Sequence, residues 1–233
     1  MYILSLETST RNFSLAVSKD EKVLRSRNIR TDKILESSMI GAIEKILGFC
    51  DLTFEQVDAL VVGLGPGSFT SLRVGLSTVK AFALATKKKL VGVCSLDVIA
   101  SGVVGAKVDE ICVLVDARRE KVYAAIYDKN LSLKSEYMLT SIDDVLKLVQ
   151  GKTLFVGDGI PLYKKHIEQA YRSHSKEKAN GCQPVFASEK FWYPQAKELA
   201  KLGGRRLQKK DFDDPAMILP IYLYPQDCQV NRS

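Results

Sequence analysis

The sequence predicts an α/β protein in which a β-β-β-α-β-α unit occurs twice, the second copy more loosely than the first. Two observations carry this prediction. The chain opens with three short apolar stretches that are separated by polar turns and are typical of an antiparallel meander: 3–7, 13–18 and 22–29. An apolar hairpin at 111–116 and 121–127 then starts the same order again. The 233 residues are enough for two lobes, which we expect at 1–105 and 106–233.

Composition argues against several classes of protein. No stretch approaches 18 apolar residues, and the first strand begins at Tyr2 without a basic leader, so we expect a cytoplasmic protein with no membrane span. The five cysteines form no Cys-x-x-Cys pair, and the histidines are only His166 and His174. We therefore expect neither a disulfide scaffold nor a metal site. The net charge of +7 suits work beside an anionic partner such as RNA, although many cytosolic proteins are as basic.

Two helices dominate the first lobe. The pattern predicts a helix over 33–50 with an apolar arc of roughly 180°, wider than the stripe of about 100° that one sheet covers. An apolar strand follows at 58–64 and ends in Gly65-Pro66-Gly67. The second helix is predicted over 70–86, with small residues and only two charges, and a short strand follows at 91–94.

The second lobe repeats this order with weaker signals. After its hairpin we expect a third strand over 132–140, a helix over 142–150, a strand over 153–157 and a helix over 160–171. Residues 172–183 are polar and predict a loop. The last helix, about 195–209, is an element that we expect to be able to pack back on the first lobe.

Two polar turns follow predicted strands. The stretch Glu7-Thr8-Ser9 ends the first strand, and Gly157-Asp158-Gly159 ends a strand of the second lobe. Their residue types are those of ordinary polar turns. The glycines at 63–67 match neither a P-loop nor a dinucleotide fingerprint, so we expect a tight entry into the next helix, capped by Ser68 or Thr70.

Four stretches carry a family resemblance: 6–10 (Leu-Glu-Thr-Ser-Thr), 65–75 (Gly-Pro-Gly-Ser-Phe-Thr-Ser-Leu-Arg-Val-Gly), 116–123 (Asp-Ala-Arg-Arg-Glu-Lys-Val-Tyr) and 220–223 (Pro-Ile-Tyr-Leu). Together with the repeated order of elements they resemble the TsaB family. The resemblance covers nearly the whole chain and implies the actin-like ATPase fold, also called ASKHA and ribonuclease H-like. Glu7 and Ser71 stand where the family pattern has Asp and Gly.

The resemblance implies a role in tRNA modification. A TsaB-like chain is expected to be a non-catalytic scaffold that binds TsaD, which makes N6-threonylcarbamoyladenosine at position 37 of tRNA. The other implied partners are a TsaE-like ATPase, tRNA through the complex, and a second copy of the chain when alone. The resemblance implies no intrinsic cofactor, but ATP or ADP could lie at the junction with TsaD. In the actin-like fold that the resemblance implies, Glu7, Thr8 and Ser9 could contact Mg²⁺ and phosphate, and Gly157, Asp158 and Gly159 could contact the adenosine.

Three other functions compete with this expectation. An active actin-like phosphotransferase would hold Mg-ATP between its lobes and would need acids such as Glu7 and Asp116 to face the nucleotide. A peptidase lacks support because no Ser-His-Asp set or His-Glu-x-x-His motif is found. A dinucleotide enzyme is disfavoured by the antiparallel opening.

The two helices of the first lobe predict a partner surface. Side by side they would expose a contiguous apolar patch, unless other parts of the chain bury both. The residues that we expect at this interface are Leu35, Met39, Ile43, Ile46, Leu72, Gly75, Leu76, Val79 and Phe82.

Two charged clusters remain open to two interpretations. Charges at Asp116, Arg118, Arg119 and Glu120 could pair with one another at a turn, or contact another member of the complex. The last helix has a basic end that complements the helix dipole or faces RNA: Lys201, Arg205, Arg206, Lys209 and Lys210.

Overall fold

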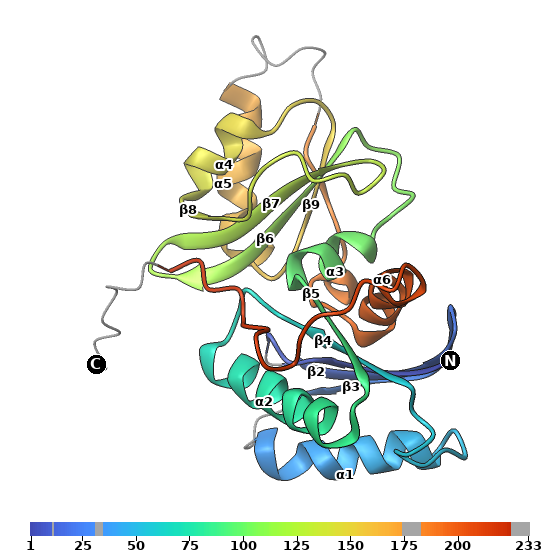
Figure 1. Cartoon of the computed structure of the whole chain (residues 1–233). Coiled ribbons are helices and arrows are strands. Elements are labelled where there is room, and N and C mark those ends of the chain that lie inside the picture. The colour runs from blue at the N-terminus through green and yellow to red at the C-terminus, as the bar shows by residue number, and fades with distance from the viewer. Residues whose placement is uncertain (11, 31–34, 174–182, 225–233) are drawn as a thin grey trace. The chain divides into compact units, whose positions relative to one another are not determined.

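The computed structural model describes residues 1–10, 12–30, 35–173 and 183–224, and the chain forms two compact units (Figure 1). Unit 1 is built from Met1–Gly102 and Tyr193–Pro220. Unit 2 contains Val103–Trp192 and the described residues after Pro220. The lobe boundary at 105 and 106 stays a prediction.

Unit 1 contains a five-stranded sheet in the order β3-β2-β1-β4-β5. Its strands are β1 (Tyr2–Glu7), β2 (Asn12–Lys19), β3 (Lys22–Arg30), β4 (Ala59–Gly63) and β5 (Lys89–Val93). The first three form the predicted antiparallel meander, whereas β4 and β5 add to β1 in parallel. Parallel addition needs crossovers, and helices supply them.

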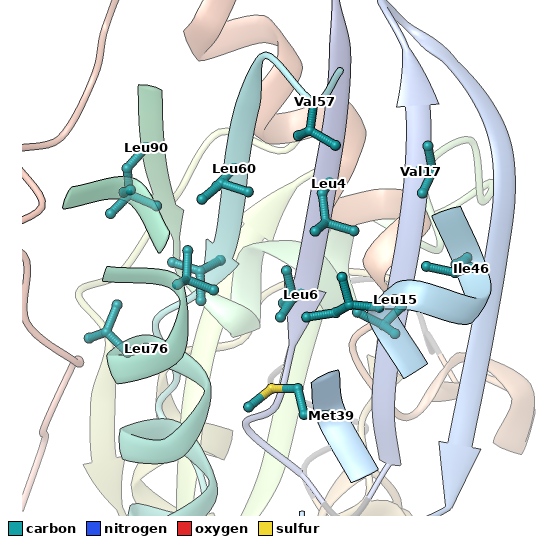
Figure 2. Packing of buried hydrophobic residues seen from close by; sticks show 14 of the residues in the cluster. Leu4, Leu6, Leu15, Val17, Met39, Ile46, Val57, Leu60, Leu76 and Leu90 are labelled. Atoms are coloured by element: carbon teal, nitrogen blue, oxygen red, sulfur yellow. The ribbon is translucent and has the colours of Figure 1, made fainter. Parts of the chain in front are cut away.

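Helices cover both faces of this sheet. On one face, α1 (Leu35–Gly48) and α2 (Phe69–Thr86) pack against a core of apolar side chains from the strands, part of which is seen in Figure 2. On the other face, α6 (Ala196–Gln208) packs Leu199 and Leu207 against Ile3, Val61 and Val91. A short helix, α3 (Ser95–Ser101), follows β5. The unit therefore needs residues from both ends of the chain.

The segment after α6 covers the edge of β5. The amide of Asp213 donates to the carbonyl of Leu90 at 2.9 Å, and the Asp213 carboxylate accepts from the amide of Gly92 at 2.8 Å. Ile218 joins the core on the side of α1 and α2. Lys80 of α2 donates to the carbonyl of Ile218 at 3.0 Å, which fixes the segment against that helix.

Unit 2 repeats the topology of unit 1. Its sheet has the order β8-β7-β6-β9-β10, in which each strand corresponds by position to one of β3-β2-β1-β4-β5. The strands are β6 (Glu110–Arg118), β7 (Lys121–Asp128), β8 (Met138–Thr140), β9 (Thr153–Val156) and β10 (Val185–Phe186). The helices α4 (Ile142–Leu148) and α5 (Ile160–Ser173) share one core with them. The predicted pseudo-duplicated α/β class is confirmed.

Several predicted elements need correction. Only Met138–Thr140 forms a strand within the predicted 132–140, because the chain turns after a single bridge between Tyr127 and Leu133. The short elements α3, β10 and η1 (Glu189–Phe191) were missed. Of the predicted loop over 172–183, residues 172 and 173 belong to α5, and 174–182 lie outside the described residues.

Candidate functional site

The acidic turn after β1 is enclosed in unit 1. Glu7 and Thr8 are fully buried, and Ser9 nearly so. The Ser9 amide donates to Glu7 Oε1 at 2.7 Å, and Ser95 Oγ donates to Glu7 Oε2 at 2.9 Å. Burial raises the pKa of Glu7, although the hydrogen bonds from Ser9 and Ser95 oppose this shift. The carboxylate is thus held by the chain itself.

Three glycines let neighbouring backbone close over this turn. A Cβ on Gly63 would overlap the Glu7 carboxylate, one on Gly67 would overlap the Ser9 carbonyl, and one on Gly75 would overlap the Thr8 side chain. A residue without a side chain is therefore needed at each of these three positions for the close approach.

Hydrogen bonds fasten this cover. The Ser68 amide donates to the Ser9 carbonyl at 2.7 Å, and the Ser95 amide donates to the Gly65 carbonyl at 2.7 Å. Ser68 occupies the N-cap position of α2, but its side chain makes no cap bond and lies 3.0 Å from Ser71 Oγ instead. Thus the glycine loop enters α2 tightly, as predicted, without the predicted side-chain cap from Ser68.

The corresponding turn of unit 2 is more open. Asp158 Oδ1 accepts from the Asp116 amide at 3.0 Å, and Asp116 pairs with Arg118 at 3.1 Å. Burial raises the pKa of Asp158. Gly157 has a φ of 125°, and a Cβ there would overlap the Leu114 carbonyl. The glycine at 159 also packs against Leu114.

The structure places the predicted nucleotide residues in different units. Glu7, Thr8 and Ser9 belong to unit 1, whereas Gly157, Asp158 and Gly159 belong to unit 2.

In the hairpin between β6 and β7, Arg118, Arg119 and Glu120 all adopt positive φ. Of the four charged residues of this turn, Asp116 and Arg118 pair with each other.

Most of the residues predicted at the partner interface lie in the core of unit 1. Six large side chains of α1 and α2 are buried by their own chain: Met39, Ile43, Ile46, Leu72, Leu76 and Val79. Gly75 faces Thr8, and Phe82 is half-buried beside Phe54 with ring centroids 4.8 Å apart. The side chain of Leu35 lies outside the described residues. The centre of the apolar arc thus packs on the sheet, and these side chains are buried within their own chain.

The outward face of α2 carries few charges. Its exposed positions are Thr70, Arg73, Ser77, Ala81, Leu84 and Ala85. Arg73 lies 3.6 Å over the ring of Phe69, which is itself more than half exposed. Lys80 is turned toward the segment at 216–218. On the neighbouring α1, Ile40 is 45% exposed. The helical wheel of 69–86, viewed opposite its buried side, could have found this face.

A family model and the named relatives together identify the family. The model described as "TsaD: tRNA N6-adenosine threonylcarbamoyltransferase" matches residues 31–222. A protein of Bacillus subtilis named "tRNA threonylcarbamoyladenosine biosynthesis protein TsaB" is 26% identical over 230 residues, covering 96% of this chain and 94% of the relative. The chain belongs to the TsaB family. The Escherichia coli protein of the same name is 29% identical over 135 residues, 56% of each chain.

Solved structures support the fold. The structure titled "YeaZ from Pseudomonas aeruginosa" has a TM-score of 0.77 at 20% identity, covering 95% of this chain and 99% of the other. A ROK hexokinase from Thermus thermophilus has a TM-score of 0.56 at 10% identity, covering 90% of this chain and all of the other. The predicted actin-like fold is therefore confirmed for this TsaB-family chain.

Metal-ligating side chains do not gather in the described residues. Among them, no three His, Cys, Asp or Glu side chains are placed to hold one ion. His166 Nε2 instead lies 2.6 Å from Asp143 Oδ1 at an exposed site, and His174 is outside the described part of the chain. No helix in the described ranges has the length and apolarity to span a membrane.

Proposed function

We propose that the chain takes part in the synthesis of threonylcarbamoyladenosine on tRNA as a non-catalytic subunit that binds a TsaD-type enzyme. The names of the TsaB relatives support the pathway. The matched family model supports a TsaD-like architecture. The scaffold role is argued from the acid turn and the outward face of α2.

The buried acid turn carries the non-catalytic part of the proposal. In an actin-like phosphotransferase, the acid at the end of the first strand needs a path to Mg-ATP. Here Glu7 is fully buried and accepts hydrogen bonds from Ser9 and Ser95, so neither carboxylate oxygen is open to a metal ion or a phosphate.

The outward face of α2 carries the partner-binding part. Ser77, Ala81 and Ala85 are exposed and small, so a helix of a partner can approach the backbone of α2 closely. Leu84, at 57% exposure, adds an apolar contact beside them. A helix face with so few charges is unusual on an 18-residue surface helix and fits a docking site. The same face would pair two copies of the chain when the enzyme is absent.

Other members of the complex follow from the same proposal. A TsaE-like ATPase and tRNA would join through the assembly, and ATP or ADP would lie at the junction with the TsaD-type subunit rather than against Glu7. These assignments rest on family membership.

Co-purification with the TsaD-type protein of the same organism tests the α2 interface. We expect Leu84→Glu to abolish capture of that protein, and Ala81→Glu to do the same, because both put a charge into an apolar contact. Leu162→Glu is the matched control, since Leu162 is an exposed leucine of α5 in unit 2. Charges at Ile43 or Val79 would be unsuitable because both side chains are core residues. Undiminished capture by both α2 variants would refute the interface.

A further inference from the structure

The outward face of α6 is a stripe of cations. Lys197, Lys201, Arg205 and Lys209 follow one another at intervals of four residues, so each lies about 40° round the helix from the last. They span about 18 Å along the axis. Leu199 and Leu207, which pack on the sheet, lie on the opposite side of the helix. We call these four residues the α6 stripe.

Helix stability accounts for only two of the four cations in the α6 stripe. Like charges four residues apart repel each other on a helix. Arg205 and Lys209 lie at the C-terminal end, where cations complement the helix dipole, but Lys197 lies in the first turn, where a cation opposes it. Stability alone therefore gives no reason for a cation at every fourth position from the first turn to the last.

The surrounding acids leave most of this charge available. Glu198 is the acid within the stripe, with an oxygen 2.9 Å from Lys201 Nζ and another 4.0 Å from Lys197 Nζ. Its side chain is mostly buried. Within the described ranges of the chain, Arg205 and Lys209 form no ion pair. Asp211 is the acid near Lys209: its pKa is lowered chiefly by its hydrogen bond from Arg206 and to a lesser extent by the charge of Lys209.

The sequence grouped Arg206 with the other cations at the basic end of the last helix, but the structure gives Arg206 a different role. Arg206 turns away from the α6 stripe and donates to the carboxylates of Asp211 and Asp213 and to the carbonyl of Gly92. Arg206 therefore fastens the segment that covers β5. Of the α6 stripe, only Lys197 and Lys201 form ion pairs among the described residues, and both pair with Glu198.

We propose that the α6 stripe binds the phosphate backbone of the tRNA on which the complex acts. This inference rests on the proposed function, because that function brings an RNA to the chain. An extended row of exposed Lys and Arg side chains on a chain of net charge +7 is the usual footprint of a nucleic-acid contact. Phosphates would be held without base readout, so the contact would be independent of tRNA sequence.

A charge-matched pair of variants tests this proposal in the full chain. The stripe variant is Lys197→Gln/Arg205→Gln/Lys209→Gln, which keeps the ion pair of Lys201 with Glu198. The control is Lys129→Gln/Lys152→Gln/Lys165→Gln, which removes three exposed lysines from unit 2 and lowers the net charge equally. Binding of a fluorescent, unmodified tRNA transcript is followed by anisotropy at salt concentrations between about 50 and 200 mM. Thermal melting checks that both variants are folded.

We expect the stripe variant to bind about 10-fold more weakly than the control at the lowest salt. The slope of log Kd against log salt should fall by about 2 to 3, because three phosphate contacts are lost. An equal loss in the control, or no tRNA binding by the unmodified chain, would overturn the proposal. So would a stripe variant that keeps tRNA binding but loses the TsaD-type partner, which would make the stripe a protein contact. Leu84→Glu should leave tRNA binding by the isolated chain intact, so the two proposals fail separately.

Discussion

Each unit has a carboxylate near the end of its first strand, yet the two carboxylates differ in burial and in their partners. Glu7 ends β1 and is fully enclosed by unit 1. Asp116 lies near the end of β6, keeps 16% of its side chain exposed, and pairs with Arg118 at the surface. The sheets have the same strand order, so topology does not make the difference. The residues that lie over each turn decide whether solvent or a ligand can reach the acid.

The positions of the glycines explain why the two acids differ in exposure. In unit 1, Gly63 and Gly67 bring backbone against Glu7 and Ser9 themselves. In unit 2, Gly157 and Gly159 bring backbone against Leu114, two residues before Asp116. The close approach of glycine backbone therefore covers Glu7 in unit 1, whereas in unit 2 it lies beside Asp116 and leaves that acid uncovered.

Gly67→Ala should have the largest effect on this comparison. The new Cβ would overlap the Ser9 carbonyl, and backbone cannot move aside as a flexible side chain can. We expect the free energy of unfolding to fall by about 3 kcal/mol, measured by urea denaturation. Gly41→Ala on α1 is the control, because nothing lies within 4 Å of its Cβ, and it should be neutral or stabilising by about 0.5 to 1 kcal/mol. Equal stability of the two variants would show that the cover over Ser9 is loose.

Ser95→Ala should have the next largest effect. It removes the donor to Glu7 and the acceptor of the Gly65 amide, and it leaves both groups buried without these bonds. We expect a loss of about 2 kcal/mol in unfolding free energy. Asp158→Ala in unit 2 should lose about 1 kcal/mol or less, since water can replace its bond to the partly exposed Asp116. A larger loss in unit 2 would reverse the comparison.

The difference in stability between Glu7→Gln and the parent chain should depend on pH, because Glu7 is buried. Because burial raises the pKa of Glu7 above its ordinary 4.5, the fold favours the protonated form. That contribution is complete below pH 4.5 and is lost as the pH rises through the folded pKa. The stability of Glu7→Gln relative to the parent chain should therefore increase as the pH rises above 4.5. Denaturation at several pH values measures the difference, and Glu44→Gln on the exposed side of α1 serves as the control for the substitution itself. A flat difference would mean that solvent reaches Glu7.

Mg-ATP should have the smallest effect of all. Since the acid of unit 1 is closed to a metal-bound phosphate, we expect no measurable rise in the melting temperature of the isolated chain when Mg-ATP is added. The negative control is Mg²⁺ alone. A rise that Glu7→Gln removes would show that the turn opens to nucleotide and would favour the phosphotransferase.

Much of this fold could be predicted from local patterns. The meander, the two long helices and the repeated order all follow from apolar periodicity and turn residues, and the ends of α2 were predicted to within one residue. The helix Ser95–Ser101 was missed because seven residues give too short a pattern. The strand Val185–Phe186 was missed for the same reason, since it is defined only by its pairing with β9.

The site was harder to predict because its decisive contacts are distant in sequence. Glu7 stands at the end of the first strand as predicted, but Ser95 bonds to it from 88 residues away. Likewise, Arg206 was grouped with its basic neighbours until its bonds to Asp211 and Asp213 separated it from them. For α1 and α2, periodicity identified the apolar residues, but it could not say that the sheet already buries Ile43 and Val79.

The late position of α6 in the chain affects how the protein is made. At the ribosome, every strand of the first sheet emerges before residue 94, yet the helix that covers Ile3, Val61 and Val91 emerges only about a hundred residues later. At a synthesis rate of about 5 to 20 residues per second, that sheet face waits roughly 5 to 20 seconds for its cover. Nascent chains therefore offer a transient apolar surface to chaperones, and a product truncated before Tyr193 would keep that surface permanently.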